Sequence, residues 1–297
     1  MRPFIALAAI VGIACSCLVQ ADEGFGPASS PPAIQKFKVG ALHLIALSDG
    51  KFIAPNDGSV FGVDVGKSAV TEFLKANGLP QDRISLSVNV LLVRTAKRVI
   101  LLDSGLGPKV NASLIASLKE AGISPAEITD IAITHTHGDH VGGLVDASGQ
   151  LAFPKATIRM SAAEWTWMKS QPGSADLVKA IETHVQTFTP GQSIAPGVKS
   201  VVLAGHTPGH VGYEITSGSH RLLDIGDLAH SSVLSLRKPE WTMGFDSDAV
   251  QAKGTRRSTL TRLAKDQEWI FATHFPYPGL GHIAADGDAF AWKPGTP

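Results

Sequence analysis

The chain has 297 residues, 44% of them hydrophobic and 18% charged, a composition typical of a globular protein with a substantial core. Its 26 basic residues balance its 26 acidic residues, which argues against a nucleic acid or an anionic membrane surface as a partner. A neutral small molecule fits this balance better than a polyanion does, and it is the partner that we expect.

The first 21 residues are typical of a signal peptide. Arg2 gives a short basic start, residues 4–19 are almost wholly apolar, and Ala21 places a small residue at the expected cleavage point. The apolar run is shorter than the roughly 20 residues that span a bilayer comfortably, so we favour cleavage over an uncleaved anchor. We expect an exported protein, periplasmic or secreted, without a stable membrane anchor. The only cysteines, Cys15 and Cys17, would leave with this leader, which excludes disulfides and thiolate ligands from the mature chain.

Residues 22–36 are predicted to form an extended arm, because 24–32 are rich in Gly, Ser and Pro. Residues 37–297 are predicted to form a single domain, in which apolar runs of strand length alternate with segments of helical spacing. We expect strands at 39–47, 87–94, 98–102, 156–160, 198–203, 221–225 and 269–273, a turn at 48–50, and helices at 67–77, 111–121, 161–168, 175–184 and 248–265, with a further helix start at 124–127. This interleaving predicts a layered α/β domain.

An apolar strand-like run at 131–133 leads directly into four residues that can bind metal: His135, His137, Asp139 and His140. The first two histidines, two positions apart in an extended segment, point the same way and can hold one ion through imidazole nitrogen. The turn that follows brings the aspartate and the last histidine within reach of a second ion. Because one metal needs about three protein ligands, four here and more downstream predict a site for two ions.

Three further candidate ligands share the property of following an apolar strand-like run: His206, Asp227 and His274. Side chains at the carboxyl ends of several strands converge on one edge of a sheet, where α/β folds place their sites. A carboxylate such as Asp227 can bridge two cations with its two oxygens, which an imidazole cannot do. A lone histidine at a strand end is usually structural, but next to the first cluster we interpret all three as ligands.

The pattern Thr-His-x-His-x-Asp-His at 134–140 resembles the hallmark of the metallo-β-lactamase superfamily. The likeness continues in order at 102–105, at 205–210, at 226–227 and at His274, so it covers nearly the whole mature chain. Membership implies a four-layer αβ/βα sandwich of two mixed sheets flanked by helices, with metal ions at one edge. It also implies that one ion takes His135, His137 and His206, that the other takes Asp139, His140 and His274, and that Asp227 bridges them.

This resemblance implies a dinuclear hydrolase in which a metal-bridging hydroxide attacks a carbonyl carbon or a phosphorus atom. Asp139 and Asp227 would then belong to the catalytic centre as well as to the ligand set. Histidine and carboxylate ligands suit zinc best, although manganese, cobalt and iron tolerate the same set.

Asp227 makes a β-lactam substrate the weaker alternative, because true β-lactamases generally lack a carboxylate there. Thioesterases of the glyoxalase II type carry it, but their basic C-terminal region has no obvious counterpart here. Residues 226–230 and 273–283 look most like the exported methyl parathion hydrolase branch, which is related to acyl-homoserine lactonases and often dimeric. Many of those lactonases have a tyrosine where this chain has His230. His230 is our candidate catalytic residue that donates a proton or hydrogen bond to the leaving oxygen, and an ordinary loop histidine is the alternative.

We therefore expect a hydrolase of small esters, lactones or phosphotriesters, with a thioesterase, a β-lactamase or a non-catalytic metal-binding protein as alternatives. A homodimer is left open. Asp103 is interpreted either as a turn residue or as a group that orients a liganding imidazole. His210 is interpreted as packing a turn, and His282 is not assigned to the site. Four aromatic residues are candidates for substrate walls but fit core positions better: Trp165, Trp167, Phe245 and Phe275.

Overall fold

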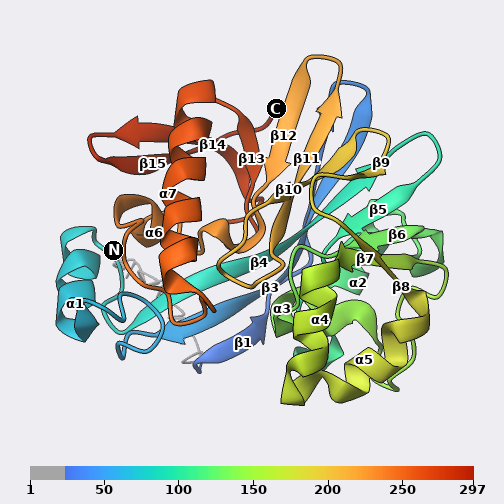
Figure 1. The fold of residues 1–297 in the computed structure, drawn as a ribbon, viewed down its shortest axis with the longest axis horizontal. Coiled ribbons are helices and arrows are strands. Elements are labelled where there is room, and N and C mark those ends of the chain that lie inside the picture. Colours follow the sequence, from blue (N-terminus) through green and yellow to red (C-terminus); the bar gives the residue numbers. More distant parts are fainter. Residues whose placement is uncertain (1–23) are drawn as a thin grey trace, which may run out of the picture.

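The computed structural model describes residues 24–297, and the predicted signal peptide lies outside this part of the chain. Two sheets face each other, and helices cover their outer sides (Figure 1). Among residues 24–297, no helix combines the length and the apolar character that crossing a membrane requires.

The first sheet is mixed and has eight strands in the order β1-β3-β4-β5-β6-β7-β8, with β2 paired to the first half of β3. The strands are β1 (Gly26–Ser29), β2 (Ile34–Val39), β3 (Leu42–Pro55), β4 (Arg83–Arg94), β5 (Val99–Leu102), β6 (Asp130–Ala132), β7 (Thr157–Ser161) and β8 (Val185–Phe188). Strands β3, β4 and β5 are antiparallel, whereas β5 to β8 run parallel to one another.

The second sheet has seven strands in the order β15-β14-β13-β12-β11-β10-β9. They are β9 (Ser193–Ala195), β10 (Val198–Val202), β11 (Val211–Ser217), β12 (His220–Asp224), β13 (Trp269–Phe271), β14 (Leu280–Asp286) and β15 (Ala289–Pro294). Neighbours are antiparallel except for β12 and β13, which run parallel, so this sheet is mixed as well.

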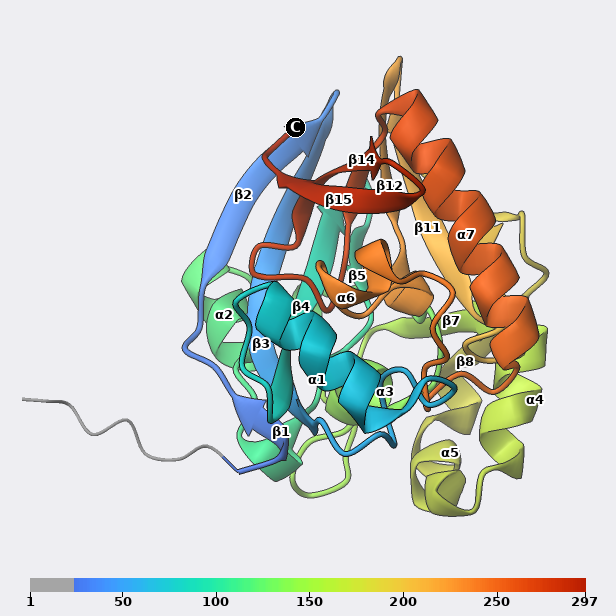
Figure 2. The ribbon, with the colours of Figure 1, turned by 90° about the vertical axis from the view of Figure 1, so that its left-hand side faces the viewer.

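The helices divide between the outer faces of the two sheets. They are α1 (Gly66–Ala76), α2 (Leu114–Ala121), α3 (Gly138–Val141), α4 (Ala162–Ser170), α5 (Ala175–Ile181), α6 (Leu234–Arg237) and α7 (Ala249–Asp266). Short 3-10 turns lie at Pro108–Val110, Pro125–Glu127, Gly142–Leu144, Pro172–Ser174, Glu182–His184 and Gly226–Leu228. Figure 1 shows α7 on the opposite side of the molecule from α4 and α5, and Figure 2 shows α7 running along one side of the molecule above them.

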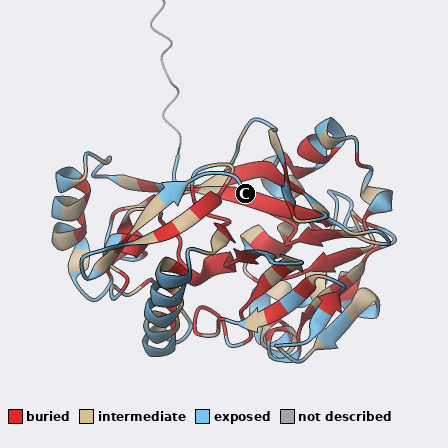
Figure 3. Ribbon diagram, turned by 90° about the horizontal axis from the view of Figure 1, so that it is seen from above, coloured by how far each residue is buried: buried red, intermediate tan, exposed pale blue. Residues whose placement is uncertain are grey.

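Alternation along the strands explains the layers. In β3, Leu44 and Ala46 face the core between the two sheets, while Ile45 and Leu47 face the core beneath α2, α4 and α5. Both faces of the central strands are therefore buried, and the exposed surface belongs to the outer sides of the helices, the loops and the edge strands (Figure 3). A third core lies between the second sheet and α7. The predicted sandwich of two mixed sheets flanked by helices is confirmed.

The expected turn at 48–50 is wrong, because β3 continues through it to Pro55. A bulge between Ser48 and Gly50 accommodates the sequence, and the Asp49 carboxylate is buried and accepts hydrogen bonds from the backbone of Leu106 and Leu114. The polar side chain thus serves a tertiary contact and not a turn. The helix expected at 124–127 is only one 3-10 turn, although its capping box is formed.

The stretch 22–36, predicted as an arm outside the domain, contributes β1 and the start of β2 to the first sheet. Its Gly, Ser and Pro residues do not prevent pairing. Both strands pair only with β3, so the backbone groups on their other edge need no partner strand.

Candidate metal centre

Residues that follow four different strands, β6, β10, β12 and β13, meet at one edge of the two sheets. The structure brings all seven predicted ligands together there, in two groups whose donor atoms lie within 4.8 Å of one another. The groups are His135, His137, His206 and Asp227, and then Asp139, His140 and His274. This convergence agrees with the expectation that strand ends bring distant residues to one site.

In the first group, three imidazoles surround a small space. Nδ1 of His137 lies 3.1 Å from Nε2 of His135 and 2.9 Å from Nε2 of His206. One oxygen of Asp227, Oδ2, lies 3.6 Å from Nε2 of His135 and 3.3 Å from Nε2 of His206.

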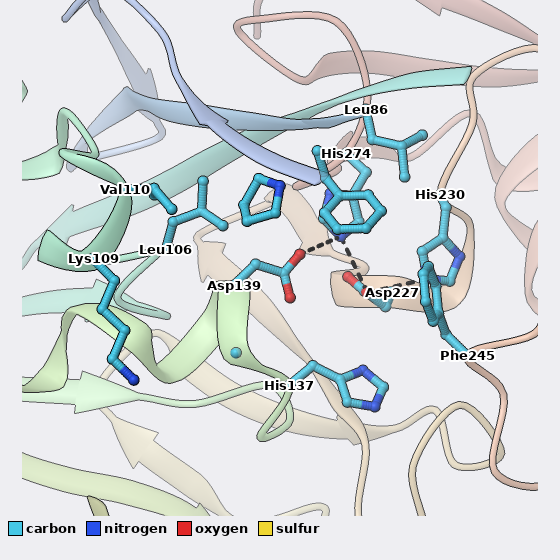
Figure 4. Close-up of a pocket in the computed structure, with 13 residues that line it drawn as sticks. Leu86, Leu106, Lys109, Val110, His137, Asp139, Asp227, His230, Phe245 and His274 are labelled. Carbon is cyan, nitrogen blue, oxygen red and sulfur yellow. Dashed lines mark hydrogen bonds and ion pairs between the residues drawn. The ribbon is translucent and has the colours of Figure 1, made fainter. Parts of the chain in front are cut away.

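The second group shares Asp227 with the first. Nε2 of His140 lies 3.1 Å from Oδ1 of Asp227 and 3.8 Å from Asp139. Nε2 of His274 lies 3.1 Å from Oδ2 of Asp227 and 3.5 Å from Asp139 (Figure 4). Asp227 therefore lies between the groups, with one oxygen turned to His140 and the other to His135, His206 and His274.

Four of the five imidazoles are held by the ring nitrogen that faces away from the site. Nδ1 of His140 donates to Asp103 at 2.7 Å, Nδ1 of His206 to Asp246 at 3.0 Å, Nδ1 of His274 to the carbonyl of Ser87 at 2.8 Å, and Nδ1 of His135 contacts the hydroxyl of Thr134 at 3.1 Å. With the proton on this outer nitrogen, each Nε2 presents a lone pair to the centre. Lone pairs that face one another at about 3 Å repel unless a metal ion or a shared proton lies between them.

The buried atoms without partners support the same conclusion. Within the described chain, Nε2 of His140 and Oδ1 of Asp227 are buried and form no hydrogen bond. Orphaned buried polar atoms are rare in native structures unless an ion or water binds them. The donor set of imidazoles and carboxylates is the one that divalent transition metals prefer, so these residues fit such ions well.

The electrostatics of the site favour positive charge. Burial alone would raise the pKa of Asp227, but His274 and His140 beside it hold that pKa well below its usual range. Burial lowers the pKa of His206, yet its contacts with Asp227 and Asp246 outweigh burial and raise the pKa to about 9. Protons or metal ions can supply the positive charge that these carboxylates demand.

An apolar pocket of about 410 Å³ opens onto the two groups. Its walls are Pro27, Phe52, Leu86, Leu106, Lys109, Val110 and Phe245, and its polar end consists of His137, Gly138, Asp139, Asp227, His230 and His274 (Figure 4). His230 is buried, its ring stacks parallel to that of His274, and Nε2 lies 3.1 Å from Asp227. Neither ring nitrogen of His230 has a hydrogen-bond partner within residues 24–297.

A family model described as the metallo-beta-lactamase superfamily matches residues 84–274. The chain belongs to this superfamily. Among solved structures, the dizinc quorum-quenching lactonase AidC, in complex with a hydrolysis product, is 30% identical with a TM-score of 0.84, over 90% of this chain and 98% of that chain. The hydrolase AbOPH is 28% identical with a TM-score of 0.78, over 93% and 99%.

A curated relative from Mycobacterium tuberculosis, named "Probable metallo-hydrolase Rv2300c", is 25% identical over 183 residues, which is 48% of this chain. The match covers 57% of that relative, so the chain spans little more than half the length of the first curated relatives that it matches.

The structure defines the contacts of several residues whose roles around this centre the sequence left open. Asp103 accepts hydrogen bonds from His140 and from both the amide and the hydroxyl of Thr134, so it orients a candidate ligand. His210, interpreted as packing a turn, also accepts a hydrogen bond at Nε2 from the amide of Asp227 and donates from Nδ1 to Leu203. Gly226 precedes Asp227 with φ +47°, and a Cβ there would lie 2.6 Å from the ring of His210.

The four aromatic candidates and His282 lie in different places in the structure. Phe245 lines the pocket, whereas Phe275 is buried in the core beneath α7. Trp167 contacts the ring of His137 at 5.6 Å between centroids, and Trp165 packs on the first sheet's outer core. His282 stacks on Trp269 away from the centre, as its exclusion from the site anticipated.

The sequence did not point to Glu164, which joins the two ligand-bearing loops. This fully buried carboxylate of α4 accepts two hydrogen bonds from Thr136, through its amide and hydroxyl, each at 2.8 Å. Its other oxygen accepts from the hydroxyl of Thr207 at 2.7 Å and from the amide of Gly209 at 3.1 Å. Thr136 lies between two candidate ligands of the first sheet and Thr207 follows His206, so Glu164 sets the distance between them.

A second buried carboxyl gives a prediction about stability. Asp224 ends β12, and burial, reinforced by the charge of Asp103, raises its pKa to about 8. A raised pKa means that ionised Asp224 destabilises the fold, so its cost appears as the pH rises from about 4 to about 8. In chelator-treated protein, Asp224→Asn should raise the melting temperature more at pH 8.5 than at pH 5, measured by circular dichroism. An equal difference at both pH values would contradict this assignment.

Proposed function

We propose that the protein is a dinuclear metal-dependent hydrolase, with zinc as the best-suited metal, acting on small neutral lactones, esters or phosphotriesters. The observation that carries the proposal is that Asp227 lies between two groups of inward-facing imidazoles at the polar end of an apolar pocket. One metal ion would be held by His135, His137 and His206, and the other by Asp139, His140 and His274. Asp227 would be a ligand common to both ions. Two cations held in this way lower the pKa of bound water toward neutrality and polarise the oxygen of an electrophile.

His230 is the residue placed to assist the leaving oxygen. It lies on the pocket side of Asp227, and burial lowers its pKa despite the nearby carboxylate, so it is neutral at pH 7. Nε2 lies 3.1 Å from Asp227, whereas Nδ1 forms no hydrogen bond within residues 24–297. A neutral ring of this kind can donate a hydrogen bond to a substrate oxygen. In this proposal His230 takes the role for which tyrosine serves in many related lactonases.

The pocket walls define which substrates can approach. Phe52, Leu86, Leu106, Val110 and Phe245 give a surface that binds an apolar group and excludes water from the reacting bond. Lys109 adds a single positive charge near the rim. A neutral substrate with one apolar substituent and one hydrolysable polar centre matches this arrangement.

The relatives support hydrolysis of a lactone before the other chemistries. AidC is a dizinc lactonase, and it matches 98% of its own length to this chain at 30% identity. AbOPH, at 28% identity, is named as a hydrolase of the same superfamily. We further propose that the protein works outside the cytoplasm, because the first 21 residues have the pattern of a signal peptide.

The test combines metal analysis with a substrate panel. We expect purified protein to contain two divalent ions per chain by plasma emission spectrometry, and to hydrolyse a lactone or a phosphotriester in a reaction that chelator abolishes and zinc restores. Turnover of cephalosporins alone would favour a β-lactamase, and turnover of thioesters alone would favour a thioesterase. Tight zinc binding without turnover of any of these would refute the hydrolase proposal in favour of a storage or sensing protein.

A further inference from the structure

A buried arginine on α7 connects parts of the site that are distant in sequence. Arg256 is only 1% exposed, which is unusual for a charged side chain. Its guanidinium faces away from solvent toward the loops that lead to the centre, and each edge of the planar group has a hydrogen-bond partner.

One arm of Arg256 reaches the metal centre through a carboxylate. Nη2 donates to Oδ2 of Asp246 at 2.8 Å, and Oδ1 of the same carboxylate accepts from Nδ1 of His206 at 3.0 Å. Asp246 is therefore fixed from one side by a guanidinium and orients a candidate ligand on the other. The orientation of an imidazole by an outer carboxylate raises its basicity as a ligand.

The other arms hold the backbone of two separate segments. Nε donates to the carbonyl of Leu228 at 2.8 Å, one residue after Asp227, and Nη1 donates to the carbonyl of Pro239 at 3.1 Å. The segment from Pro239 to Asp246 carries Phe245, which forms a pocket wall between Phe52 and His230. Arg256 thus fixes both ends of the segment that presents Phe245.

We propose that Arg256 is a positioning residue that sets the orientation of the metal ligand His206 and the place of the substrate wall at Phe245 together. The part of this proposal that concerns His206 can be tested without a substrate, whereas the part that concerns Phe245 rests on the proposed function. A planar group with five donors can satisfy a carboxylate and two carbonyls at once, which an ammonium group cannot do with the same geometry. An arginine that served only the fold would affect stability, but it would not change both the zinc affinity and the KM.

The experiment measures zinc affinity by competition with a chromogenic chelator and, separately, KM and kcat for the best substrate at saturating zinc. Arg256→Met should weaken zinc binding by about 10- to 100-fold and raise KM at least about fivefold. Arg256→Lys keeps a charge beside Asp246 and should recover zinc affinity more fully than KM. Arg257→Met, an exposed neighbour on the same helix, serves as the matched control and should match the parent in both measurements.

Two further variants separate the effect on His206 from the effect on Phe245. Asp246→Asn weakens the route to His206 and one of the two anchors of the Phe245 segment, so it should weaken zinc binding as Arg256→Met does but raise KM less. Phe245→Ala should raise KM without changing zinc affinity. If Arg256→Met is folded by circular dichroism and retains the zinc affinity and KM of the parent, the proposal is overturned. Should that variant not fold, parental zinc affinity in Asp246→Asn would overturn it equally. Absence of turnover in the parent would count against the proposed function, and zinc affinity alone would then decide the role of Arg256.

Discussion

Asp227→Ala is expected to abolish hydrolysis, lowering kcat/KM by at least about 1,000-fold, because the metal ions supply several kcal/mol of transition-state stabilisation and each 1.36 kcal/mol is a factor of ten. Asp227 contacts imidazoles of both groups, at 3.1 Å to His140 and to His274 and at 3.3 Å to His206. Removing it deletes the one ligand that both groups share. Metal content should fall below two ions per chain.

A thermal measurement tests the role of Asp227 in metal binding without a substrate. In the parent, zinc should raise the melting temperature, because a ligand that binds only the folded state stabilises it by mass action. In Asp227→Ala this increase should largely disappear. Asp288→Ala, an exposed aspartate, is the matched control and should keep the parental response. A variant at position 227 with two metals and full activity would show that the bridging assignment is mistaken.

Glu164→Gln should destabilise the metal-free protein by about 2–4 kcal/mol, because two of four buried donors lose their acceptor. An amide offers one carbonyl oxygen, and its NH₂ group would face donors from Thr207 and Gly209 or from Thr136. Loosening the contact between the two ligand loops should also weaken zinc binding by about 10- to 100-fold.

Urea unfolding of chelator-treated protein and chelator competition measure the two effects of Glu164→Gln. Glu182→Gln, at an exposed position, should leave both unchanged. If Glu164→Gln loses stability but binds zinc as the parent does, Glu164 serves the fold and not the spacing of the ligands.

The convergence of the seven candidate ligands could be predicted from the sequence because each segment that carries them follows an apolar run, and the carboxyl ends of those strands meet at one edge. The layers were predictable for the same reason, since alternation along β3 fills two cores at once. These signals are local, and a short window of sequence contains them.

Glu164 and Arg256 could not be recognised in that way, because their partners lie in other segments. Ser161 and Glu164 have the spacing of a helix capping pair, and Ser161 does accept from the amide of Glu164. The glutamate carboxylate instead reaches across to both ligand loops. Arg256 lies in a helix whose neighbours Arg257 and Ser258 are exposed, so its burial is a property of the tertiary structure.

Glu164 connects a loop of the first sheet to a loop of the second, and ions bound beside it would connect the same two halves more strongly. His137 and His206 are 69 residues apart, and Asp227 and His274 are 47 apart. No cysteine follows position 17, so cation coordination is the cross-link available to a mature chain cut after residue 21. Ions that bind only the folded chain stabilise it by mass action, and in this way they could serve the purpose that a disulfide serves in many exported proteins. Zinc supply would then govern how long such a protein survives extracellular proteases, besides whether it turns over substrate.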